Sequence, residues 1–167
     1  VQTCALPISE SLLKELTVKL YKRNPRELHK VSGQTIDYRV TQIFTTPGRL
    51  QFAELPVTGT DAIELSVNPD YQGDRVFALM VGLTEMIRAS YGYQTEFYLF
   101  SELDHQKLYH SARNIEIALW RIARSDDGSG LPLIVTNSWH SKKQNLSYER
   151  LFGKLIAMQD MMAIIMA

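Results

Sequence analysis

The sequence predicts a mainly α-helical protein folded as a single-domain helical bundle. Apolar residues recur every three or four positions along several long stretches, which is the spacing of one face of an α-helix. The chain has 167 residues, a length that suits one domain able to bury its own hydrophobic core. No stretch has the pattern of a parallel sheet, so helices packed on helices are the expected architecture.

Four long helices are expected, over residues 9–23, 74–91, 101–124 and 147–166. Ser9 and Ser147 suit the start of the first and the last, because a serine oxygen can accept a bond from an unpaired N–H group there. The last two helices carry the strongest apolar faces and need a common partner. We therefore expect a bundle with the last helix near its centre.

Shorter helices are expected between the long ones. Asn24 and Pro25 supply an N-cap and a proline at the first helical position, and Glu27 is placed for a capping box, so a short helix starts there. Over residues 32–50 the helix and strand patterns conflict, and we favour a helix. Another short helix is expected over residues 61–67.

A short two-stranded ribbon is considered beside these helices. Residues 95–100 are rich in aromatic side chains and could form a strand. Their only plausible partner is the segment of residues 131–136. Because an isolated pair of strands is marginally stable, the ribbon would be an accessory to the helical fold.

The apolar spacing also predicts the core and the close helix crossings. Ala78 and Gly82 lie four positions apart on one helix, as do Gly153 and Ala157 on another. A glycine inside a helix costs about 1 kcal/mol relative to alanine, so we expect a packing reason, namely close crossings of these helices. The core is expected to contain Leu79, Leu83, Ile115, Leu119, Leu155 and Met158.

The first eight residues, VQTCALPI, resemble one reading frame of a common sequencing adapter. We therefore expect residues 1–8 to be non-native, unpacked and dispensable, with the domain spanning residues 9–167. Cys4, the only cysteine, lies in this segment, so the domain itself has no thiol. A disulfide framework, a thiolate nucleophile and a cysteine-ligated metal site are excluded for it.

The charge balance argues against nucleic acid as a partner. Eighteen basic residues match eighteen acidic ones, so no global field attracts nucleic acid or an anionic membrane surface. The most apolar stretch, residues 151–167, is interrupted by Lys154, Gln159 and Asp160. It is also shorter than the roughly 20 apolar residues that a membrane span needs, so it is expected to be a core helix.

No motif for catalysis, metal binding or a cofactor is found, and no catalytic residue is assigned. His105 and His110 are five positions apart and lie on different faces of a helix, unlike the histidines of a zinc-binding helix. A Ser-His-Asp triad is defined by geometry and stays open, although no G-x-S-x-G sequence supports one.

One set of polar residues is a candidate ligand-binding site. Tyr109, Arg113, Glu116 and Trp120 are spaced by four, three and four positions, so they share one helix face. One interpretation is an ion pair of Arg113 with Glu116, or with Glu85 of a neighbouring helix, among packed aromatic rings. The other is a groove that takes a planar or anionic group.

Four runs of the sequence resemble parts of an uncharacterised proteobacterial family whose members are predicted envelope lipoproteins. The runs are LYKRNPREL at 20–28, GDRVFALMVGL at 73–83, LDHQKLYHSARNIEIALWRI at 103–122 and NLSYERLFGKLIAMQD at 145–160. The resemblance implies the cell envelope or periplasm rather than the cytoplasm, with a lipid anchor before Ser9. It implies no activity and no site residues.

These observations favour a non-enzymatic envelope, scaffold or interaction protein that binds a protein partner through a helical surface. The alternative is a small-ligand-binding protein or an enzyme with a pocket near Tyr109, Arg113, Glu116 and Trp120. No cofactor is expected, and a membrane would be reached only through the N-terminal anchor. The oligomeric state is left open.

Overall fold

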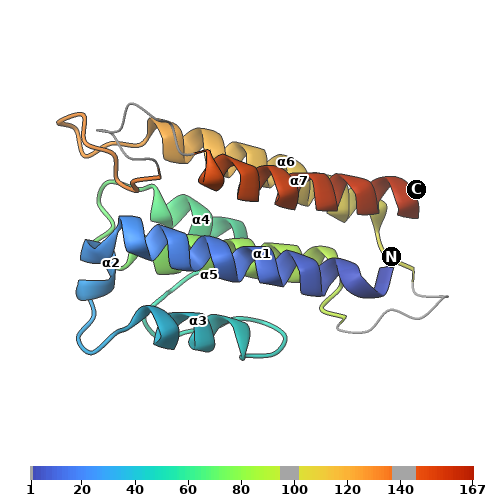
Figure 1. Ribbon diagram of the computed structural model, residues 1–167, viewed down its shortest axis with the longest axis horizontal. Helices are drawn as coiled ribbons and strands as arrows, with labels where there is room; N and C mark the ends of the chain where they lie inside the picture. Colours follow the sequence, from blue (N-terminus) through green and yellow to red (C-terminus); the bar gives the residue numbers. More distant parts are fainter. Residues whose placement is uncertain (1, 95–101, 137–145) are drawn as a thin grey trace.

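A computed structural model describes residues 2–94, 102–136 and 146–167 and confirms the mainly α-helical fold (Figure 1). The helices are α1 (Gln2–Arg23), α2 (Pro25–His29), α3 (Ile36–Phe44), α4 (Gly59–Ser66), α5 (Arg75–Ser90), α6 (His105–Arg124) and α7 (Ser147–Met166). None of them is both long and apolar enough to cross a membrane.

The helices pack in layers. α6 and α7 lie side by side and antiparallel in one outer layer, α1 and α5 lie beneath them, and α3 lies on the opposite side (Figure 1). α4 packs closely on α5, and α7 packs on both α6 and α1. Among the described helices, none packs against the remaining side of α7.

The centre of the bundle is α5, so the expectation that the last helix lies there is wrong. Every residue of α5 except Ala89 is buried, because this helix is apolar or internally bonded around its whole circumference. α7 has an apolar inward face, but Gly153, Ala157 and Ile164 on its other side are exposed. Its high apolar content reflects two different faces and does not indicate full burial.

The predicted core is confirmed. Leu79, Leu83, Ile115 and Leu155 have no exposed surface. Leu119 and Met158 are partly buried and pack against this core. Of the two small-residue pairs, only one marks a close crossing.

Gly82 lies where α5 meets α4, and a Cβ atom there would stand 2.6 Å from the Gly59 carbonyl oxygen and 2.9 Å from the Ile63 nitrogen. Gly82 therefore has the expected packing reason. At Gly153 a Cβ would meet no atom within 4 Å, so no described helix makes the crossing expected at Gly153 and Ala157.

Part of the segment 1–8 is packed, contrary to the expectation that all of it is unpacked. α1 begins at Gln2 rather than near Ser9, and Ala5 and Leu6 are buried in the core. The leucine spacing of α1 continues upstream through Leu6, which extends the same apolar face by one turn. The adapter origin of these residues stays a prediction.

The other helix ends lie within a few residues of their predicted positions, but the predicted caps are wrong. Ser9 lies inside α1, and Ser147 is the first helical residue of α7, after Leu146 at the N-cap position. α6 begins at His105, where Asp104 accepts bonds from the N–H groups of Gln106 and Lys107 at 2.9 and 3.3 Å. Glu27 does not close a capping box on its own helix. It is buried, and it accepts a bond from the Arg75 N–H at 2.9 Å at the start of α5.

The two-stranded ribbon is not supported. Residues 131–136 form no strand, and residues 95–100 lie outside the described residues. Pro132 makes an isolated bridge with Asp126 in the preceding loop. The Asn24 side chain accepts a bond from the Val135 N–H at 2.7 Å and donates one to its carbonyl at 2.8 Å. The Asn24 side chain, just after the end of α1, therefore fixes the position of residues 131–136, which the prediction assigns to pairing with a second strand.

Candidate functional site

The predicted site residues lie along α6, and Arg113 is the centre of their contacts. Its Nη2 atom donates to Asp160 Oδ2 of α7 at 2.7 Å, and its Nε atom lies 3.1 Å from Glu116 Oε2. The guanidinium also lies 4.9 Å from the centre of the Tyr109 ring. The expected pair with Glu116 is therefore confirmed, and Asp160 is a partner that the sequence did not suggest.

Glu85, the other expected partner of Arg113, is used elsewhere. It is buried near the end of α5, where it accepts bonds from the Leu50 N–H at 2.8 Å and from the Tyr93 hydroxyl. The two arrangements could not be distinguished by spacing, because α5 and α6 are joined by a loop whose path the spacing does not define.

The four predicted residues border two separate hollows. Tyr109 and Arg113 line a hollow of about 450 Å³ between the start of α6 and the end of α7. Glu116 and Trp120 line another, of about 630 Å³, which also includes Tyr148. The four residues share a helix face, as predicted, but they do not face one common pocket.

The hollow beside Trp120 has an apolar lining and a charged rim. The Trp120 side chain is 59% exposed, and the Arg124 guanidinium lies 4.5 Å from the centre of its ring. Leu119 and Ile134 contribute apolar lining. The Tyr148 hydroxyl is buried there without a hydrogen-bond partner among the described residues, and burial raises the pKa of this phenol.

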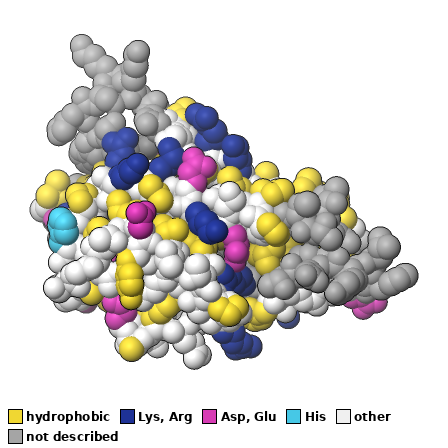
Figure 2. All heavy atoms as spheres, turned by 60° about the horizontal axis from the view of Figure 1, so that its bottom comes forward, with side chains coloured by type: hydrophobic (Ala, Val, Ile, Leu, Met, Phe, Trp, Pro, Cys, Tyr) yellow, Lys and Arg dark blue, Asp and Glu magenta, His cyan; other side chains and the backbone are white. Residues whose placement is uncertain are grey.

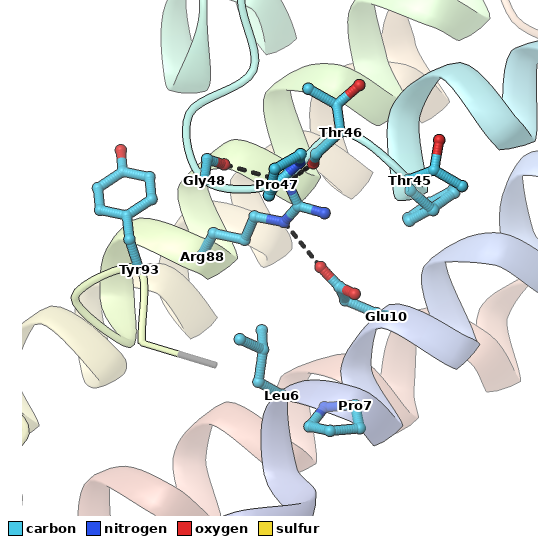
Figure 3. Close-up of a pocket in the computed structure, with 10 residues that line it drawn as sticks. Leu6, Pro7, Glu10, Thr45, Thr46, Pro47, Gly48, Arg88 and Tyr93 are labelled. Atoms are coloured by element: carbon cyan, nitrogen blue, oxygen red, sulfur yellow. Dashed lines mark hydrogen bonds and ion pairs between the residues drawn. The ribbon is translucent and has the colours of Figure 1, made fainter. Parts of the chain in front are cut away.

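A third hollow, of about 280 Å³, lies between α1, the end of α3 and the end of α5 (Figure 3). Arg88 projects across it. Its Nε atom donates to Glu10 at 2.7 Å, and its Nη1 atom donates to the carbonyls of Thr46 at 2.7 Å and Gly48 at 3.0 Å. Leu6 and Pro7 of α1 form an apolar wall (Figure 3).

The polar groups of this third hollow are already bonded within the protein. The Thr45 and Thr46 hydroxyls donate to carbonyls of α3, and the Tyr93 hydroxyl donates to Glu85. Glu10 balances the charge of Arg88. A ligand would find few free polar groups here, so we interpret Arg88 as a structural tie between α5, α1 and the loop after α3.

A buried polar network that the sequence analysis missed lies between α1, α3 and α5. Arg39 of α3 has no exposed surface and forms an ion pair with Glu54. Its Nη2 atom lies 3.3 Å from Asp74 Oδ2, which also accepts a bond from the Tyr21 hydroxyl at 2.7 Å. The Arg39 guanidinium lies 3.9 Å from the centre of the Phe77 ring.

Burial dominates the proton affinities in this network. It raises the pKa of Asp74, although bonds from the Phe77 N–H, the Tyr21 hydroxyl and Arg39 act in the opposite direction. It also raises the pKa of Tyr21, to which nearby Asp74 contributes. The one sequence signal was the position of Arg39 on the apolar face of α3, three residues after Ile36 and four before Ile43.

Arg39, Asp74 and Tyr21 of this network are buried, only the Glu54 side chain reaches the surface, and the network borders none of the hollows described above. It therefore orders the fold and offers no access to a substrate. In the described ranges no group of three His, Cys, Asp or Glu residues could hold a metal ion. His105 and His110 are both exposed.

Compared with family models, curated proteins and solved structures, the chain matches none. The contacts and surfaces of the chain itself therefore carry the functional argument.

Proposed function

We propose that this protein is a helical interaction protein that binds a protein partner through the surface around Trp120. The observation that supports this is the distribution of exposed apolar side chains. Of the ten large hydrophobic side chains most exposed in the described ranges, eight lie between the start of α6 and the end of α7. They are Tyr109, Ile117, Trp120, Leu131, Leu146, Met161, Ile164 and Ile165.

The opposite side of the molecule differs in this respect. Figure 2 turns the side of α3 toward the viewer, and there hydrophobic side chains are dispersed among basic, acidic and polar ones. The only large hydrophobic side chain of α3 among the most exposed is Tyr38. An apolar concentration on one layer is typical of an interaction surface, whereas dispersed apolar residues are normal for any protein surface.

Trp120 is suited to be the main anchor of a partner. A tryptophan next to an apolar hollow can bury a large area on binding, and such residues dominate the energies of many interfaces. The stacked Arg124 restricts the ring before binding, which lowers the entropy lost on association. A partner side chain that enters the hollow could also pair with the buried Tyr148 hydroxyl.

The ligand-binding alternative is less favoured by the contacts of Arg113. Both Asp160 and Glu116 lie against its guanidinium, so the positive charge that would attract an anionic ligand is already balanced. A ligand would have to displace one of these carboxylates. We therefore interpret the set around Arg113 as an ion-pair cluster that joins α6 to α7.

The test compares two aromatic surface variants as baits in an extract of the source organism. We expect Trp120→Ala to lose a partner that the wild type retains, and Tyr38→Ala to keep it, because Tyr38 is similarly exposed on the opposite layer, at 56%. The captured protein is then purified and its dissociation constant measured. A central aromatic anchor predicts a weakening of about 30-fold or more for Trp120→Ala.

Two results would contradict the proposal. One is a purified partner that binds both variants with equal affinity. The other is unchanged capture of every partner by a Trp120→Ala protein that circular dichroism and the melting temperature show to be folded.

We further propose the cell envelope as the location, on the basis of the family resemblance alone. Recovery of the gene from an intact genome tests this directly. Codons for a signal peptide and a lipid-attachment cysteine ahead of Ser9 would support it, and a native upstream sequence without them would contradict it.

A further inference from the structure

The side of α7 that faces away from the bundle has an unusual composition. We define this outer face as the exposed residues Arg150, Gly153, Lys154, Ala157, Met161 and Ile164. They recur at intervals of three and four, so they lie along one stripe, opposite the inward face that contains Leu151, Leu155 and Met162. The Ile164 side chain is 77% exposed, the largest exposure among the hydrophobic residues described.

Gly153 has no packing contact among the described residues that would require a glycine. Gly82 is required because any side chain would meet α4, but a Cβ at Gly153 would meet no described atom within 4 Å. A glycine within a helix costs about 1 kcal/mol relative to alanine, and no described contact offsets that cost here. A close approach by another backbone would offset it.

We propose that the outer face of α7 pairs with the same face of a second copy, with the two helices antiparallel and a two-fold axis at Ala157. This geometry places Ala157 against its own counterpart and Gly153 level with Met161 of the second copy. It also places Arg150 level with the other Ile164. The small Gly153 thus lies opposite the large Met161, and at the axis two alanines allow the backbones to approach.

The charges select the antiparallel orientation. In a parallel pair each Lys154 and each Arg150 would lie beside its own counterpart, and like charges would repel. In the antiparallel pair Lys154 lies at the level of position 160 of the second copy instead of beside its own counterpart. Asp160 itself faces α6, where it pairs with Arg113. The stem of Arg150 can extend over Ile164, toward the partly negative carboxyl end of the other helix.

The dimensions indicate a weak dimer. The residues from 150 to 165 span about 24 Å of helix, so one helix pair buries less than the roughly 1,200 Å² typical of stable complexes. Association should therefore depend on protein concentration. This pairing shares Met161 and Ile164 with the apolar layer described above but does not involve Trp120. Trp120→Ala therefore tests the proposed partner surface without changing the outer face of α7.

Sedimentation over a concentration series tests the pairing in the whole protein. We expect a monomer–dimer equilibrium for the wild type and for Ala53→Arg, which changes an exposed alanine in the loop between α3 and α4. Ala157→Arg should weaken the dimer by about a hundredfold, because it places two charges at the axis. A wild-type monomer at every concentration would overturn the proposal, as would a dimer that Ala157→Arg leaves unchanged.

Cysteine cross-linking tests the position of the axis. In a Cys4→Ser background, Ala157→Cys should form a disulfide-linked dimer on oxidation, since equivalent residues at a two-fold axis lie next to each other. Ala53→Cys is the matched control and should stay monomeric. Equal cross-linking at the two positions would show random collision and would rule out the axis at Ala157.

Discussion

Arg39 illustrates how a buried charge depends on its partners. Its guanidinium is removed from water, and Glu54, Asp74 and the Phe77 ring supply the contacts that replace hydration. Burial raises the pKa of Asp74, so its charged form costs free energy in the folded state. The positive charge of Arg39 reduces that cost. Loss of the guanidinium would leave a buried carboxylate with less compensation.

We expect Arg39→Ala to lower the free energy of unfolding by about 3 to 5 kcal/mol, because it breaks the fully buried ion pair with Asp74. The matched comparison is Arg113→Ala. That side chain is 34% exposed, so its pairs are screened by solvent and the loss should be about 1 kcal/mol or less. Urea unfolding of both variants measures the difference, and equal losses would contradict this assignment of the two clusters.

The two clusters also differ in how far the sequence could predict them. The pair of Arg113 with Glu116 follows from their spacing on one helix, which fixes their separation. Asp160 lies on another helix, and its meeting with Arg113 depends on how α6 and α7 align. The partners of Arg39 come from two other parts of the chain, the loop after α3 and the start of α5, so no local pattern could identify them.

At the scale of helices, Gly82 and Gly153 form a natural pair of experiments. Both are helical glycines, but one is enclosed by α4 and the other is open. We expect Gly82→Ala to destabilise the protein by about 1 to 3 kcal/mol, since a Cβ would overlap the Gly59 carbonyl. In dilute, monomeric protein Gly153→Ala should stabilise it by about 0.5 to 1 kcal/mol.

Chemical denaturation of the two alanine variants measures these opposite signs. A stabilised Gly82→Ala protein would show that α4 and α5 can separate at little cost. A destabilised Gly153→Ala protein at low concentration would show that Gly153 has a role within the single chain.

The position of α7 was wrongly predicted for a reason that applies to many bundles. Apolar content was used as a measure of centrality, but α7 divides its apolar residues between the core and the outer face. α5 is shorter, and its burial includes Thr84 and Glu85 as well as apolar residues. Which helix becomes central depends on how many neighbours surround it.

The whole molecule should lose stability in alkali, because burial holds several phenols in the neutral form. The pKa of Tyr91 and of Tyr93 is raised from 10.0 to about 12 by burial, with Glu85 adding to the effect at Tyr93. Burial also raises the pKa of Tyr21 and Tyr148.

Each raised pKa means that the folded state keeps its proton more tightly than the unfolded state. This contribution to stability is complete below pH 10 and is lost as the pH rises through about 12. Urea unfolding at several alkaline pH values should therefore give a falling free energy of unfolding, with a smaller slope for Tyr91→Phe. Ionisation of all eight tyrosines in a still-folded protein, seen by ultraviolet absorbance and circular dichroism, would refute this.

The sequence by itself determined the fold class, most helix positions, the core residues of α5, α6 and α7, and the place of Arg113 beside Glu116 on one helix face. These depend on periodicity and capping, which act between residues a few positions apart. The tertiary structure decided the central place of α5, the burial of Leu6, the network of Arg39 and the division of the predicted site into two hollows. These features depend on which helix faces meet, and the free energy that selects one arrangement comes from contacts between residues distant in the sequence.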